Sequence, residues 1–192
     1  MLVFVVHSLM MVINSYSEIL DFWFAPRNVP KHFESDKEFD AHVTKKYEGV
    51  YLLARSGELE SWKDKPTSLL SLIIVLDQFP RNMFRDKKKM YETDNLAVSL
   101  SRLAIEKSYD QKLSDTYKVF LYMPLMHSEK IKDQELSLSL YGKFDDKLTY
   151  DFAKRHYDVV IRFGRFPHRN DILGRKSTEE EEEFIKLNPT GF

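Results

Sequence analysis

Residues 69–76 form the segment that most limits how this chain can fold. They read Leu-Leu-Ser-Leu-Ile-Ile-Val-Leu, so the segment is apolar on nearly every side, whether it forms a helix or a strand. Such a segment must be covered by other parts of the chain all round. Its β-branched residues would suit a buried strand, but the helical patterns before and after it favour a helix. We predict a central helix that starts at a Thr67 cap and has the rest of the chain packed around it.

The remaining sequence is dominated by helical patterns. Only seven prolines and six glycines interrupt the 192 residues, and strict two-residue alternation is hard to find. Glu180 and Glu181 follow Ser177 or Thr178 in capping-box position, which predicts a last helix with a solvated acidic first turn. Further helices are predicted from Ser15 or Ser17 to Phe24, and from Ser35 or Asp36 to about Arg55, with Gly57 as the stop. Asp94 is predicted to cap a helix to about Lys107, and Ser114 to cap one that is kinked or ended by Pro124. Two more helices are predicted at 129–141 and 148–163. The sequence therefore predicts an all-α protein of eight or nine helices, arranged as antiparallel helix pairs.

The length and composition favour one folded domain. A chain of 192 residues can bury one sizeable core, and 43% hydrophobic with 14% aromatic residues is typical of a folded protein. We assign residues 15–192 to a single α-helical domain and residues 1–14 to an apolar N-terminal extension. The extension is too short to span a bilayer. It has no basic leader and no small-residue cleavage site, so we expect an upstream extension or a first helix docked on the body, not a targeting segment.

Charge and cysteine content exclude several functions. The net charge is 29 − 30 = −1, which gives no overall field for attracting nucleic acid or an anionic membrane. Residues 154–176 carry a local excess of positive charge but no recognisable nucleic-acid reader motif, so nucleic-acid binding is not expected. The chain has no cysteine, which excludes disulfides, thiolate catalysis and iron–sulfur clusters and fits a cytoplasmic location. No transmembrane span is predicted.

Three short strings attach charged and hydrogen-bonding groups directly to apolar stretches. Residues 79–82 read Phe-Pro-Arg-Asn, and residues 166–170 repeat this as Phe-Pro-His-Arg-Asn. Residues 123–129 read Met-Pro-Leu-Met-His-Ser-Glu. Ions beside a core are costly unless they pair with each other or serve a ligand. Because each string ends or follows an apolar helix that must pack centrally, and proline restricts each turn, we expect the three strings to converge on one site.

The residue types in these strings suggest recognition of a small anion. Arginines grouped with amides bind carboxylates or phosphates, and a histidine beside a carboxylate can act as a general acid or base near neutral pH. The candidate ligand-binding residues are Asp77, Arg81, Asn82, Arg162, Arg165, Arg169 and Asn170. The candidate catalytic residues are His127, His156, His168 and Glu129. Metal-binding spacings such as HExxH are absent, so no metal is predicted, and no cofactor is identified.

Two of these residues also have a purely structural interpretation. Asp77 stands at the C-terminal end of an apolar helix, where the helix dipole disfavours negative charge, so we expect it to pair with Arg81. That pair would equally well close a tight turn without any ligand. His156 is predicted to lie on the apolar stripe of its helix with Phe152 and Val160, as core histidines do.

Two functional hypotheses follow. In the first, the chain forms a pocket that binds, and as an enzyme would act on, a small anionic metabolite. In the second, helix pairs form a concave surface for a partner protein, and the charged strings only fix its geometry. The sequence leaves open whether the protein is an enzyme. Convergence of the three strings on one cavity would favour the first hypothesis, and their burial in fully paired networks would favour the second.

From Glu18 onward, the sequence resembles a mostly bacterial family known as domain of unknown function 924. The resemblance rests on residues 19–24, 57–59 with Trp62, 76–85, 120–129 with 133–135, and 163–175 with 177–179. It implies the tetratricopeptide-like fold in which that family is placed, a superhelix of paired helices. It implies no activity, substrate or catalytic residues. The tetratricopeptide consensus at a spacing of about 34 residues is absent from the chain.

Overall fold

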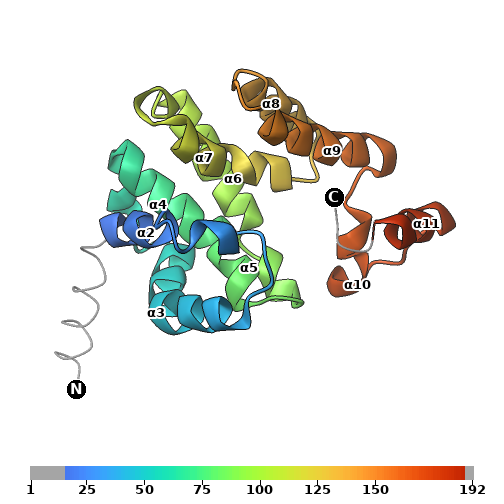
Figure 1. The fold of residues 1–192 in the computed structure, drawn as a ribbon, viewed down its shortest axis with the longest axis horizontal. Coiled ribbons are helices and arrows are strands. Elements are labelled where there is room, and N and C mark those ends of the chain that lie inside the picture. Colours follow the sequence, from blue (N-terminus) through green and yellow to red (C-terminus); the bar gives the residue numbers. More distant parts are fainter. Residues whose placement is uncertain (1–15, 189–192) are drawn as a thin grey trace.

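The computed structural model describes residues 16–188, and every regular element in that range is helical (Figure 1). The predicted all-α class is therefore confirmed. Eight of these α-helices have eight residues or more, and two are shorter. The α-helices are α2 (Tyr16–Trp23), α3 (Lys37–Ser56), α4 (Pro66–Asp77), α5 (Phe79–Met83), α6 (Asp94–Glu106), α7 (Asp115–His127), α8 (Ile131–Tyr141), α9 (Lys147–Phe163), α10 (Asn170–Leu173) and α11 (Glu179–Leu187). The predicted extension at residues 1–14 lies outside the described residues, and the single-domain assignment stays a prediction.

Helix α4 is the centre of the fold, as the apolar segment 69–76 predicts. It packs against α2, α3, α6 and α7, and the residues of the segment are each at most 3% exposed. The predicted Thr67 cap is wrong, because α4 already begins at Pro66. Proline suits the first helical position, where its missing N–H would have no partner and its fixed φ matches the helix.

The cap of α6 connects the end of α4 to the start of α6. The sequence predicts Asp94 as the cap, but Thr93 occupies that position and Asp94 is the first helical residue. The Thr93 hydroxyl donates a hydrogen bond of 2.6 Å to the backbone carbonyl of Leu76, one residue before the end of α4. Asp94 is thereby held beside the turn that follows α4.

Other predicted boundaries agree with the structure. Asp36 caps α3 by accepting the backbone N–H groups of Glu38 and Phe39, and Gly57 ends that helix with a φ of 83°, a value that glycine adopts without strain. Thr178 forms the predicted capping box at α11. Of the two outcomes predicted at Pro124, an end of the helix does not occur: the proline lies inside α7, which continues to His127.

The helices from α6 to α9 each pack on the next one along the chain (Figure 1). This order is consistent with the helix-pair arrangement that the resemblance implies. After α9, residues 164–187 form a C-terminal part that contains a 3-10 helix, Pro167–Arg169, together with α10 and α11. Phe166 and the end of α9 form a small apolar cluster of their own with Phe184.

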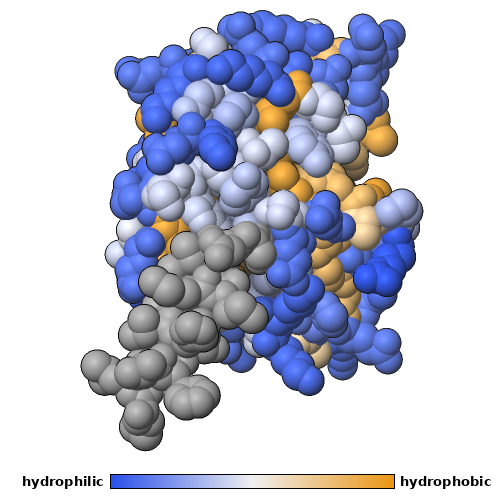
Figure 2. All heavy atoms as spheres, turned by 90° about the vertical axis from the view of Figure 1, so that its left-hand side faces the viewer, coloured by the Kyte–Doolittle hydropathy of each residue, from blue (hydrophilic) through white to orange (hydrophobic). Residues whose placement is uncertain are grey.

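On the face shown in Figure 2, hydrophilic side chains cover most of the described surface and apolar ones occupy narrower areas between them. Within residues 16–188, no helix is both long and apolar enough to cross a membrane.

Candidate functional site

Asp77 lies at the centre of a buried polar cluster at the end of α4. Its side chain is inaccessible to solvent, and its carboxylate lies 3.4 Å from Arg81 Nη1, the pairing that the helix-end argument predicts. It also lies 2.9 and 3.1 Å from Nδ1 of His127, the last residue of α7. Burial alone would raise the pKa of Asp77, but Arg81 and His127 outweigh it and hold that pKa below its ordinary value.

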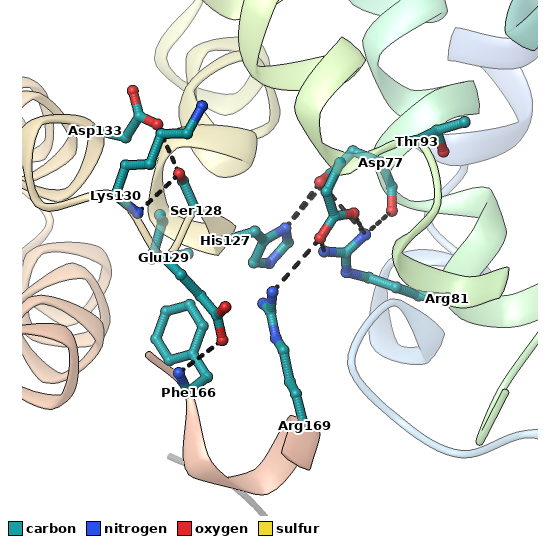
Figure 3. A network of polar contacts seen from close by, with 12 residues as sticks. Asp77, Arg81, Thr93, His127, Ser128, Glu129, Lys130, Asp133, Phe166 and Arg169 are labelled. Atoms are coloured by element: carbon teal, nitrogen blue, oxygen red, sulfur yellow. Dashed lines mark hydrogen bonds and ion pairs between the residues drawn. The ribbon is translucent and has the colours of Figure 1, made fainter. Parts of the chain in front are cut away.

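A second carboxylate, Asp94, joins two arginines from separate strings. Arg81 donates from Nη1 and Nη2 to the two oxygens of Asp94, at 3.1 and 3.2 Å. Arg169 Nη1 lies 3.5 Å from one of the same oxygens. Asp94 therefore links the first Phe-Pro string to the second, and Figure 3 shows Arg169 and His127 pointing toward the region beside Asp77 and Arg81.

Arg169 is buried with few hydrogen-bonding partners. Only 7% of the residue is exposed, and its guanidinium lies 4.6 Å from the ring centre of Tyr91 and 4.5 Å from that of Phe166. Its Nε is buried without a hydrogen-bond partner in the part of the chain that the structure describes. Burial lowers the pKa of Arg169 despite the opposing effect of Asp94, although a guanidinium stays protonated in proteins.

Glu129 attaches the third string to the second. Its carboxylate accepts the backbone N–H of Phe166 at 2.8 Å and pairs in bidentate fashion with Arg175 at 2.6 and 2.9 Å. Burial would raise the pKa of Glu129, but Arg175 and this N–H lower it overall. Both carboxylate oxygens are thus occupied by structural partners.

Helix α8 holds the third string in place. The Ser128 hydroxyl donates to Asp133 at 2.6 Å. The Gln134 amide donates to the backbone carbonyls of Met126 and Ser128, at 2.7 and 2.6 Å. These bonds fix the backbone on both sides of His127, so the imidazole has a defined position at the end of α7.

Two of the three candidate histidines, His156 and His168, lie beside Phe166, and the third, His127, lies beside His156. The ring centres of His127 and His156 are 6.4 Å apart, and Phe166 lies 5.6 Å from His156 and 5.8 Å from His168. His156 Nδ1 bonds the backbone carbonyl of Phe152 at 2.8 Å, and burial lowers the pKa of His156 to about 3. The predicted apolar stripe of α9 is incomplete, because Phe152 is 40% exposed.

The other predicted ligand-binding residues have structural partners other than Asp77, Asp94 and His127. Asn82 donates to Asp40 at 2.8 Å. Asn170 donates to Ser177 at 3.0 Å. Arg162 pairs with Glu180 on the exposed surface, and Arg165 pairs with Glu181. The predicted group of Arg162, Arg165 and Arg169 is therefore divided, because the acidic first turn of α11 pairs with the first two.

A cavity of about 300 Å³ adjoins the cluster. Its lining includes Tyr91, Asp94, His127, Glu129, Lys130 and Arg169. The second and third strings line the cavity directly. The first string does not line it, but its Arg81 bonds to Asp94 in the cavity wall. No three histidine, aspartate or glutamate side chains within residues 16–188 are placed to hold a metal ion.

Sequence reasoning missed three contributors to this arrangement: the contact of His127 with Asp77, the role of Asp94, and Arg175. One usable signal was present for the first. Asp77 and His127 each end a helix that is apolar all round, and two such central helices have to pack together. The sequence offered no comparable signal for Arg175.

Stability is expected to fall as the pH drops from about 6.5 to 4.5, the interval between the ordinary histidine and glutamate values. Burial lowers the pKa values of His127 and His156, so in this interval the unfolded chain takes up protons that the folded protein does not. His156 should contribute up to about 1.4 kcal/mol per pH unit, and His127 should add to the slope in the same direction. Urea unfolding at several pH values measures the slope, and His156→Gln should flatten it. A wild-type free energy of unfolding that is constant between pH 7 and 5 would contradict neutral rings of His127 and His156 in the folded protein.

Comparison with known proteins places nearly all of the described region in one family. A family model described as "Bacterial protein of unknown function (DUF924)" matches residues 19–188. A solved structure of a protein of unknown function from Agrobacterium tumefaciens, ATU0120, is 38% identical to this chain, with a TM-score of 0.85. The match covers 90% of this chain and 97% of that one. No curated protein matches the sequence.

Proposed function

The chain belongs to the DUF924 family of bacterial proteins of unknown function, and we propose that its cavity binds a small molecule with a carboxylate or phosphate group. The observation that carries this proposal is the buried guanidinium of Arg169 on the cavity wall. A buried donor without a partner costs free energy. A planar guanidinium matches the oxygens of carboxylates and phosphates in bidentate fashion.

The neighbours of Arg169 leave its donors available. Its ion-pair partner Asp94 is 3.5 Å away and already accepts both terminal nitrogens of Arg81. The rings of Tyr91 and Phe166 hold the plane of the guanidinium without accepting conventional hydrogen bonds from it. Lys130, which is exposed, adds a second positive charge to the cavity lining. An incoming anion would thus meet a preoriented cation.

Among the four predicted catalytic residues, we assign a chemical role in the cavity to His127. It lines the cavity and has a carboxylate partner that orients its ring, the arrangement in which histidine acts as a general acid or base. Glu129 also lines the cavity, but Arg175 and the Phe166 N–H occupy its oxygens.

Calorimetric titration with phosphate and a panel of small mono- and dicarboxylates tests the proposal. Arg169→Lys keeps the positive charge but loses the planar two-pronged guanidinium and its stacking between the rings of Tyr91 and Phe166. We therefore expect anion binding to weaken at least about tenfold, or about 1.4 kcal/mol. Arg162→Lys is the matched control, because Arg162 is exposed and paired with Glu180; its affinity should equal that of the wild type. Thermal unfolding of both variants shows that they are folded. Unchanged affinity in Arg169→Lys, or no anion bound by the wild type, would refute the proposal.

The same titration separates the two functional hypotheses. A protein-binding module whose charged strings only fix its geometry would bind none of these anions. A partner protein would bind to an apolar surface of this chain. The groove beside Phe33, a residue that is 76% exposed, is such a surface. The interaction-module hypothesis stays a prediction.

A further inference from the structure

The tautomer of His127 is set by its carboxylate partner. An ionised carboxylate only accepts hydrogen bonds, so the Nδ1 of His127 that faces Asp77 must carry the proton. In the neutral ring, Nε2 is then an acceptor. Nε2 makes no hydrogen bond within residues 16–188, and His127 lines the cavity. The cavity therefore has a hydrogen-bond acceptor as well as cationic donors.

This acceptor differs from the two carboxylates in the same lining. Asp94 is shared by two arginines. Glu129 accepts from a guanidinium and a backbone N–H. Each of these carboxylates already faces cationic or N–H donors of the protein, whereas the lone pair of His127 Nε2, in the same lining as Arg169 and Lys130, accepts no hydrogen bond from the described residues. An anion without an O–H group, such as sulfate, can accept hydrogen bonds from Arg169 and Lys130. Its oxygen lone pairs would, however, face the lone pair of His127 Nε2, where no hydrogen bond can form.

We infer that the ligand carries an O–H donor on or beside its anionic group, as hydrogen phosphate and 2-hydroxycarboxylates do, and that Nε2 of His127 accepts a hydrogen bond from that O–H. The inference rests on the proposed anion-binding function and narrows its ligand class. The same hydrogen bond is the starting geometry for proton transfer: the ligand O–H bond would break as an N–H bond forms at Nε2. Asp77 would balance the charge of the resulting imidazolium.

The charged and titratable surroundings of His127 support a neutral ring. Asp77 and Arg81 approach it from the end of α4 and from α5, Asp94 from α6, His156 from α9 and Arg169 from the C-terminal part. Burial, and next the positive charge of Arg81, lower the pKa of His127 more than Asp77 raises it. Near pH 7, the neutral His127 ring therefore offers Nε2 to the cavity as a hydrogen-bond acceptor.

The tautomer can be measured without any ligand. Nitrogen-15 NMR of the imidazole rings, assigned by the signals lost in His127→Gln, should show His127 protonated at Nδ1 and unprotonated at Nε2 at pH 7. Protonation at Nε2 alone, or at both nitrogens, would overturn the inference.

Phosphate and sulfate form a matched pair of probes for the ligand. Both are tetrahedral oxyanions of similar size, but near neutral pH phosphate keeps at least one O–H and sulfate has none. The wild type should bind phosphate at least about tenfold more tightly than sulfate by calorimetry, and lactate more tightly than propionate. Discrimination of this size is reasonable when a site is built to hydrogen-bond a hydroxyl.

Two variants test the assignment to His127. Asp77→Asn removes the charge that fixes the proton on Nδ1, because the new amide can donate to Nδ1 as well as accept from it. Both ring tautomers then become available, so the phosphate preference should shrink. In His127→Gln, the amide both donates and accepts, so the ratio of phosphate affinity to sulfate affinity should fall close to one. This variant tests the assignment even if Asp77→Asn does not fold. Equal wild-type affinity for phosphate and sulfate would refute this inference and leave the anion-binding function intact. If neither anion binds, the proposed function fails and the inference fails with it.

Discussion

Replacing Asp77 by alanine is expected to lower the free energy of unfolding by about 3–5 kcal/mol, the usual cost of removing one partner from a buried ion pair. Its carboxylate is inaccessible to solvent and contacts both Arg81 and His127. Alanine leaves the Arg81 guanidinium with one carboxylate instead of two and the His127 Nδ1–H without an acceptor. Urea unfolding monitored by circular dichroism measures the loss.

Asp158→Ala is the matched control for this substitution. Asp158, like Asp77, lies on a helix and has a basic partner, Lys154, but its side chain is 54% exposed. Exposed pairs contribute little, so the control should change stability by less than about 1 kcal/mol. A loss below about 1 kcal/mol for Asp77→Ala as well would show that the cluster does not contribute to folding.

Ile73→Ala in the centre of α4 is expected to cost about 2–5 kcal/mol, because it removes buried methyl groups and leaves a cavity. Ile73 is 0% exposed, in a helix that contacts most of the others. Ile161→Ala is the same substitution on α9, where Ile161 is 57% exposed, and it should cost less than about 0.5 kcal/mol. Equal effects at the two positions would contradict the central place of α4 in the core.

Local patterns predicted the parts of this fold that depend on local physics. The apolar run at residues 69–76 predicted a buried helix. Asp36, Gly57 and Thr178 marked helix ends because capping depends on adjacent residues, although the predicted caps Thr67 and Asp94 were wrong. The pairing of Asp77 with Arg81 was predictable for the same reason, since the two residues are one helical turn apart.

Contacts between distant segments were harder to predict. Asp77 meets His127 because α4 and α7 pack so that these two ends coincide, which depends on packing geometry and not on spacing along the chain. The local charge excess at residues 154–176 suggested that Arg162 and Arg165 were available for a ligand. The range 154–176 leaves out the glutamates at the start of α11, and these form ion pairs with both arginines.

The division of the cavity wall between the body and the C-terminal part affects the order in which the site can form. Asp94 and His127 belong to helices of the main core, whereas Arg169 belongs to residues 164–187, which pack in a small cluster and are attached through Glu129 and Arg175. During synthesis on the ribosome, the cavity can close only after residues 164–187 have emerged and docked on the helices that carry Asp94 and His127. A ligand that bridges His127 and Arg169 would then bind only the docked arrangement, and its binding energy would add to the attachment of the C-terminal part.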